Sequence, residues 1–151
     1  MAVLVIAEHD NSVLKTSTFN TITAATNLSD DIHLLIIGKD IETLSNNAKS
    51  IYPIKKVLKC DNSKLENFIP ELSAPIISNI ANGYTHILAP ASTFGKNLLP
   101  RVSALLDITQ ISDVIEIVTE NTFVRPIYAG NAISHVETNQ NINLLTPGRK
   151  K

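Results

Sequence analysis

The chain has 151 residues, a length that suits one domain with a substantial buried core. Its 13 Lys and Arg nearly balance its 14 Asp and Glu, which argues against nucleic-acid binding and against a polybasic membrane binder. A single cysteine, Cys60, excludes an internal disulfide and a zinc site made of cysteines.

The apolar start of the chain is too short for a signal peptide or a membrane span, because Glu8 interrupts it. It predicts a first strand over residues 2–8, buried on both faces. Two further apolar runs predict strands over residues 32–37 and 85–89, and a short strand is expected over residues 55–60, with Val57 and Leu58 at its centre. No transit peptide is visible, so we expect a bacterial cytoplasmic protein or an already processed chain, without membrane insertion.

Segments of helical spacing follow these strands, over residues 14–28, 40–51, 65–68, 72–81 and a last stretch that ends at residue 106. Asp40 suits the N-cap of the second helix, and Pro75 suits the first turn of the fourth. Gly83 suits a helix C-cap. This alternation predicts βαβ units and a parallel sheet with right-handed crossovers.

The last third of the chain has a different pattern. Short β-like runs cover residues 112–119, 122–129, 132–137 and 142–145, with turn residues and no helical stretch between them. We therefore expect hairpins and an antiparallel extension of the sheet. The domain should span residues 1–145, and residues 146–151 should form a mobile, charged tail.

The motifs of common nucleotide-binding sites are absent from the sequence. No two glycines have the spacing of the dinucleotide fingerprint, and the turn after the first strand contains no glycine. Gly95 and Lys96 resemble the end of a P-loop, but Asn97 stands where that loop needs Ser or Thr. His9 and Asp10 could form an acid–base pair, although a polar turn with a solvated histidine explains them more simply. We find no catalytic constellation and expect no metal site.

Residues 89–101 are richer in polar groups than a helix start requires. They follow the fourth strand, and ligands of open α/β sheets bind outside the carboxyl ends of strands. Ser92, Thr93 and Lys96, together with the backbone N–H groups of a helix start, would suit an anion. The alternative is an ordinary helix start with a solvated lysine.

Pro100 leaves two starting points open for this helix. If Asn97 is the N-cap, the proline falls in the first turn, where its missing N–H is harmless. If the helix begins at Ser92, Pro100 should kink it.

Several ordered segments resemble the N-terminal domain of the electron transfer flavoprotein alpha subunit. They occur in the order and spacing of that family, and the resemblance extends to about Leu145. The segments are residues 4–9, 20–26, 94–101, 111–115 and 122–125 with 127–132.

The resemblance implies a three-layer α/β/α domain with a mostly parallel sheet, related to the adenine-nucleotide-binding fold of universal stress proteins. It also implies an alpha subunit that pairs with a beta subunit in a heterodimer carrying one FAD. Such heterodimers carry electrons from acyl-CoA dehydrogenases of fatty acid β-oxidation, and from other dehydrogenases, to a membrane quinone reductase. The equivalent domain of the beta subunit binds AMP, whereas the alpha domain normally does not.

The family holds FAD mainly in a separate C-terminal domain of the alpha subunit, and this sequence closes before that domain, at residue 151. No FAD-contacting residue can therefore be carried over. We expect no cofactor in this chain alone, and the role of an electron-carrier subunit rather than an enzyme. An excised domain, a shortened gene and a remainder on a separate chain all fit this ending.

The leading hypothesis is a structural and docking domain of such a heterodimer. The candidates for an anion loop or a subunit interface are Ser92, Thr93, Gly95, Lys96, Asn97, Arg101, Arg125 and Tyr128. A stand-alone adenine-nucleotide-binding module resembling universal stress proteins is the alternative function. A hydrolase is a third hypothesis, for which no nucleophile–base pair is visible.

Overall fold

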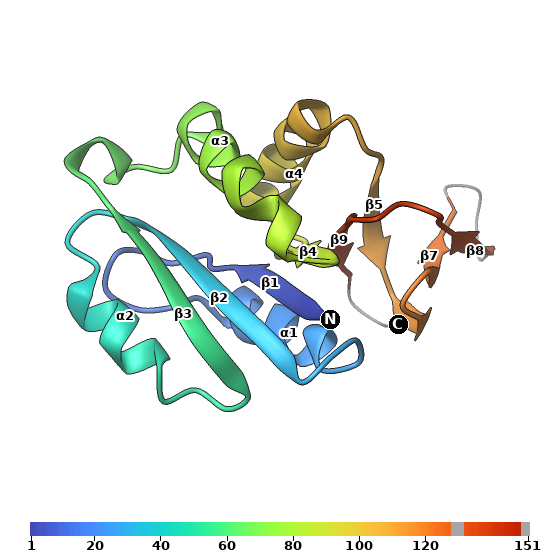
Figure 1. Cartoon of the computed structure of the whole chain (residues 1–151), viewed down its shortest axis with the longest axis horizontal. Helices are drawn as coiled ribbons and strands as arrows, with labels where there is room; N and C mark the ends of the chain where they lie inside the picture. Colours follow the sequence, from blue (N-terminus) through green and yellow to red (C-terminus); the bar gives the residue numbers. More distant parts are fainter. Residues whose placement is uncertain (128–131, 149–151) are drawn as a thin grey trace.

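The computed structural model describes residues 1–127 and 132–148. Six parallel strands form the main sheet, in the spatial order β3 (Ile54–Asp61), β2 (Asp31–Gly38), β1 (Ala2–Ile6), β4 (His86–Leu88), β9 (Asn143–Pro147) and β5 (Gln110–Val114). A separate antiparallel sheet contains β6 (Glu116–Thr119), β7 (Thr122–Pro126) and β8 (Ile133–Glu137). The small sheet lies beside β5 (Figure 1).

Helices cover both faces of the main sheet, so the expected three-layer α/β/α architecture is confirmed. The helices α1 (Thr16–Ala25) and α2 (Glu42–Ala48) contribute to the core on one face. The helices α3 (Pro70–Ile80) and α4 (Thr93–Leu106) contribute to the core on the other.

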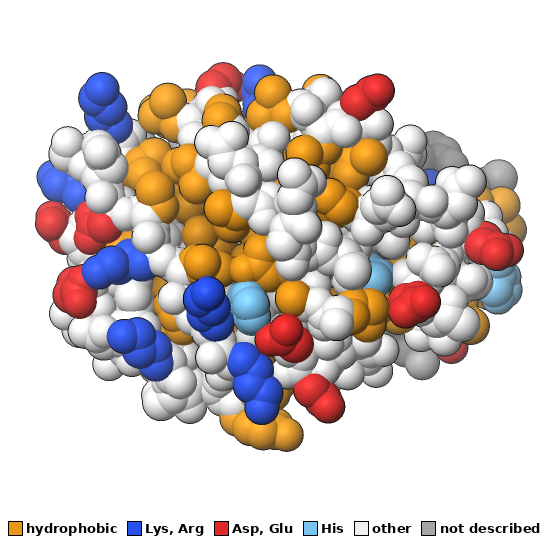
Figure 2. Space-filling view, viewed as in Figure 1, with side chains coloured by type: hydrophobic (Ala, Val, Ile, Leu, Met, Phe, Trp, Pro, Cys, Tyr) orange, Lys and Arg blue, Asp and Glu red, His pale blue; other side chains and the backbone are white. Residues whose placement is uncertain are grey.

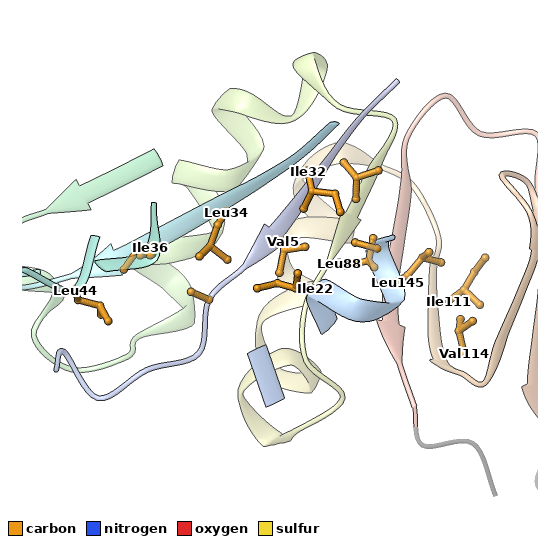
Figure 3. Close-up of a cluster of buried hydrophobic side chains, with 14 of the residues drawn as sticks. Val5, Ile22, Ile32, Leu34, Ile36, Leu44, Leu88, Ile111, Val114 and Leu145 are labelled. Carbon is orange, nitrogen blue, oxygen red and sulfur yellow. The ribbon is translucent and has the colours of Figure 1, made fainter. Parts of the chain in front are cut away.

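The core is aliphatic and is divided into two layers by the sheet. Along β1, Val3 and Val5 belong to the layer under α1 and α2, whereas Leu4 and Ile6 belong to the layer under α3 and α4. Figure 3 shows the first of these layers, in which side chains from several strands converge on α1 and α2. Phe123 of β7 is fully buried in the same layer and so fixes the small sheet to the main one.

The expectation of hairpins is wrong for residues 142–145. Residues 143–145 belong to β9, which pairs in parallel with β4 on one side and β5 on the other. Leu144 and Leu145 are both fully buried, one in each core layer, as in a central strand of a parallel sheet. The turn spacing could not reveal this placement, because β9 inserts between two strands that come much earlier in the chain. It extends to Pro147, beyond the boundary predicted at residue 145.

Residues 112–119 form parts of two strands rather than one. The strand β5 ends at Val114 and β6 begins at Glu116, and the backbone of Asp113 lies in the left-handed region with φ of 55°. This conformation lets the chain leave the main sheet and enter the small one. The expected antiparallel strands of the last third are confirmed for β6, β7 and β8.

The N-cap predicted at Asp40 is wrong, because α2 begins at Glu42 and Asp40 has a φ of 54°. A side chain on the neighbouring strand β3 instead holds the backbone that leads into α2. The carboxylate of Asp61, at the end of β3, accepts hydrogen bonds from the backbone N–H groups of Asp40 at 2.9 Å and Ile41 at 3.0 Å. These two residues precede the first helical residue, so Asp61 fixes the backbone that enters α2, and its negative charge is favourable near the helix N-terminus.

Proline positions around α3 also differ from expectation. Pro70 occupies the start of the helix, where no N–H is needed, and Pro75 lies in its interior rather than in a first turn.

The short helix predicted over residues 65–68 is not formed. Residues 66–68 are not helical, and only the 3-10 turn Ser63–Leu65 overlaps the predicted range. Gly83 ends a second 3-10 turn, Ala81–Gly83, rather than capping α3.

Candidate functional site

The carboxyl ends of the parallel strands form the edge at which this fold binds ligands. Chain order runs outward from β1 through β2 to β3, and then returns to the other side of β1 at β4. Ligands of open α/β sheets bind at such a switch point. Two cavities lie there, one on each side of the segment that follows β1.

The first cavity has a volume of about 260 Å³ and lies between the end of β1, the loop before α3 and the start of α4. Its lining includes Glu8, His9, Glu66, Thr93 and Asn97. Two aromatic rings from the same lining, Phe68 and Phe94, pack with their centroids 4.5 Å apart.

The second cavity has a volume of about 580 Å³ and is lined by the first half of α1, the loop before α4 and the end of β9. Its polar lining includes Ser17, Asn20, Ser92 and Asp113. A hydrogen-bond network centred on Glu8 separates this cavity from the first.

The Glu8 carboxylate joins the starts of α1 and α4. One of its oxygens, Oε1, accepts hydrogen bonds from the hydroxyls of Ser17 and Ser92, both at 2.7 Å. The other, Oε2, lies 3.7 Å from Lys15 Nζ. The side chain is only 14% exposed, so these contacts are largely shielded from water.

The backbone of Glu8 is fixed by one residue of α1. Its N–H donates to Thr18 Oγ1 at 2.8 Å, and the same hydroxyl donates to the carbonyl of Glu8 at 2.9 Å. Thr18 is fully buried. The carboxylate therefore projects from a fixed backbone into a fixed set of donors.

The predicted anion loop is brought to this network, but two of its polar side chains already have carboxylate partners. The helix α4 begins at Thr93 with Ser92 as its N-cap, so the second of the two expected starts is confirmed, and Pro100 lies inside the helix. Ser92 donates to Glu8, and Lys96 Nζ lies 3.2 Å from Asp113 Oδ1.

Gly95 is buried where α4 passes close to the preceding loop. A Cβ at this position would overlap the carbonyl oxygen of Pro90. The glycine is therefore needed for packing, which the sequence pattern did not indicate.

The interface candidates are spread over two regions. Arg101 joins α4 to α3 through an ion pair with Glu71 at 2.6 Å, and its side chain is half exposed. Arg125 on β7 donates from Nε to the carbonyl of Ser112 at 3.1 Å, which joins the small sheet to β5. Tyr128 lies outside the described residues.

His9 and Asp10 do not form an acid–base pair with each other. His9 Nδ1 accepts a hydrogen bond from the N–H of Asn11 at 2.9 Å, and Nε2 donates to the carbonyl of Ile37 at 2.8 Å. Burial lowers the pKa of His9, which favours this neutral form. Asp10 accepts from the N–H groups of Val13 and Ser12 in the following turn, and these bonds lower its pKa.

Sequence reasoning missed Glu8 as the centre of this site. Its partner Ser92 lies 84 positions away, and a single carboxylate after a strand is not a distinctive signal. Within residues 1–127 and 132–148, no three His, Cys, Asp or Glu side chains are grouped as metal ligands. No helix in that part of the chain has the length and hydropathy that a membrane span needs.

Comparison with known proteins gives one family. The electron transfer flavoprotein domain profile matches residues 3–148. The chain is 46% identical over 146 residues to the electron transfer flavoprotein subunit alpha of Pseudomonas aeruginosa, covering 97% of this chain and 47% of that protein.

Two further relatives are also alpha subunits of this family. The mitochondrial alpha subunit of Dictyostelium discoideum is 43% identical over 143 residues, covering 89% of this chain and 40% of its own length. The alpha subunit of Bradyrhizobium diazoefficiens is 40% identical over 146 residues, covering 97% and 46%. The chain thus spans less than half the length of each of these three relatives.

Proposed function

Because the chain belongs to the electron transfer flavoprotein family, we propose that it is the N-terminal domain of an alpha subunit and acts as a structural and docking domain. It pairs with the beta subunit, and the assembled heterodimer carries FAD. That heterodimer takes electrons from dehydrogenases such as acyl-CoA dehydrogenases and passes them to a membrane quinone reductase. The chain is thus part of an electron carrier rather than an enzyme.

One observation carries this proposal. Similarity to alpha subunits extends over 97% of the chain at 46% identity, yet covers only 47% of the Pseudomonas aeruginosa relative. A domain that makes up part of an alpha subunit accounts for both figures.

The polar residues at this edge of the sheet do not fit the diphosphate of FAD, which supports a flavin site elsewhere in the heterodimer. The diphosphate of a flavin nucleotide needs helix N-termini and free cationic or hydroxyl donors. At this edge Glu8 already takes the hydroxyls of Ser17 and Ser92, and Asp113 takes Lys96. Both carboxylates would also repel a diphosphate.

The surface offers apolar area for docking. Hydrophobic side chains gather between α3 and β3 on the face shown in Figure 2. At the start of α3, Phe68, Ile69 and Leu72 are each about 40% exposed. On the small sheet, Val118 and Ile133 are 50% and 54% exposed. Apolar area of this kind is typical of surfaces that another polypeptide covers.

The alternative of a stand-alone nucleotide-binding module is not favoured by the same contacts. Phosphate binding through Ser92 and Lys96 would require both to leave carboxylate partners. Thermal unfolding with AMP or ATP distinguishes the two functions, because a bound nucleotide stabilises the fold in a saturable manner. We expect no saturable shift.

The flavin content of the purified chain tests the main proposal. We expect the chain alone to show no flavin absorbance after purification, even from cells supplied with riboflavin. Stoichiometric FAD bound to this chain alone would overturn the proposal, because the flavin site would then lie within residues 1–151.

A further inference from the structure

Two helix N-termini meet at the carboxyl edge of the sheet, and neither has an anionic group of its own. The N-cap residues of α1 and α4, Lys15 and Ser92, make no side-chain capping hydrogen bond. Neither helix has an acidic residue in its first turn. Negative charge at a helix N-terminus is stabilising, so this edge favours an anion.

The chain supplies that anion from a third element. Glu8 follows β1, and one carboxylate oxygen accepts from Ser17 in the first turn of α1 and from Ser92 at the start of α4. Lys15 Nζ lies 3.7 Å from the other oxygen. Two hydroxyls and an ammonium around one oxyanion are the donors that a bound phosphate would require.

We propose that Glu8 is a specificity-determining residue that serves as the resident anion of this edge and excludes phosphorylated ligands from both cavities. Its carboxylate occupies the donors that a phosphate needs and repels a second anion through its charge. The cavities on either side are therefore closed to nucleotides, although the fold presents two helix N-termini to them. This inference does not depend on the docking function.

Replacement of Glu8 should convert the edge into a phosphate site. In Glu8→Ser the shorter side chain removes the charge and leaves Ser17, Ser92 and Lys15 facing an empty position. Inorganic phosphate is the probe, compared with chloride at equal ionic strength, and the melting temperature is followed by far-ultraviolet circular dichroism. Phosphate also stabilises proteins generally by exclusion from their surface, so a matched variant is required.

Glu66→Ser is that control. Glu66 lines the first cavity and loses the same charge, but it pairs with Lys39 at 3.7 Å and has no hydrogen bond to the N-terminus of α1 or α4. We expect phosphate to raise the melting temperature of Glu8→Ser by about 2–4 °C more than that of Glu66→Ser or the wild type, in a saturable manner. The additional substitution Ser92→Ala should remove most of this difference.

Equal phosphate responses in Glu8→Ser and Glu66→Ser would overturn the proposal. A saturable response of the wild type, equal to that of Glu8→Ser, would overturn it as well. If Glu8→Ser is unfolded in chloride, phosphate at the same ionic strength should restore its helical signal, and failure to do so would also contradict the inference.

Discussion

At Gly95 even the single methyl group of alanine should strongly lower the stability of the fold. The position faces the backbone of the preceding loop, and a Cβ there would overlap the carbonyl oxygen of Pro90. We expect Gly95→Ala to lower the free energy of unfolding by about 3 kcal/mol, as overpacking against a backbone atom does. Urea unfolding followed by circular dichroism measures this change.

Gly83 provides the matched control for that substitution. A Cβ at Gly83 would meet no atom within 4 Å. Gly83→Ala should therefore leave stability unchanged or raise it by up to about 1 kcal/mol, because alanine restricts the unfolded chain. Similar losses at both glycines would contradict the packing argument.

His86 connects the main sheet to the small one in its neutral form. Its side chain is almost fully buried, with Nε2 donating to the carbonyl of Glu120 at 2.7 Å and Nδ1 lying 2.8 Å from Thr85 Oγ1. Its ring also packs edge-on against Phe123. Burial lowers the pKa of His86, although the carbonyl and the charge of Glu120 act in the opposite direction.

Acid should therefore destabilise the fold through His86. The ordinary pKa of histidine is 6.5, and well above this pH the imidazole is neutral in both the folded and the unfolded state. Below it the unfolded chain binds the proton more readily than the folded chain does. The free energy of unfolding should fall as the pH drops from 7.5 to 5.5. His86→Gln should reduce this slope without abolishing it, because His9 also has a lowered pKa.

His135→Gln is the control, since that histidine is exposed on β8. It should keep the wild-type dependence on pH. Urea unfolding of the three proteins at pH 7.5, 6.5 and 5.5 provides the comparison, and identical slopes in His86→Gln and the wild type would show that the buried imidazole is not responsible.

At the scale of the elements, apolar runs made β1, β2 and β4 predictable, because a strand buried on both faces has few polar residues. What the sequence could not show is contact between distant segments. The carboxylate of Asp61 holds the backbone before α2 from another element, and Glu8 meets Ser92 only in the folded chain. Such contacts leave no periodic signal, which is why the sequence indicated a helix start near Ser92 but not the contact of that serine with Glu8.

The strand β9 allows a test of where the folded unit ends. Thr146 is fully buried, and its hydroxyl accepts from the N–H of Asp113 at 2.9 Å. The N–H of Gly148 donates to the carbonyl of Val114 at 2.7 Å. Residues 146–148 therefore hold β5 at the point where the chain leaves the main sheet.

Removal of residues 146–151 should cost about 2 kcal/mol, from two lost hydrogen bonds and the lost burial of Thr146. The melting temperature should fall by roughly 5 °C. Removal of residues 149–151 alone keeps every one of these contacts and should change the melting temperature by less than about 1 °C. Equal effects of the two deletions would place the boundary near residue 145 instead.

At the scale of the whole molecule, the family was predictable because separate segments resembled it in the right order. The comparison with known proteins confirms that prediction over residues 3–148. The chemistry at the sheet edge is consistent with a supporting role, because its own carboxylates occupy the donors that a cofactor phosphate would use.

Co-purification with the cognate beta subunit tests this account most directly. The tagged chain is produced together with the beta subunit and a separate chain that carries the second half of the alpha subunit, and the eluate is analysed by mass and by flavin absorbance. We predict an assembly of the three chains with one FAD, and no flavin on the tagged chain when it is produced alone. Elution of the tagged chain without the beta subunit, while the other two chains are soluble and present, would contradict the account.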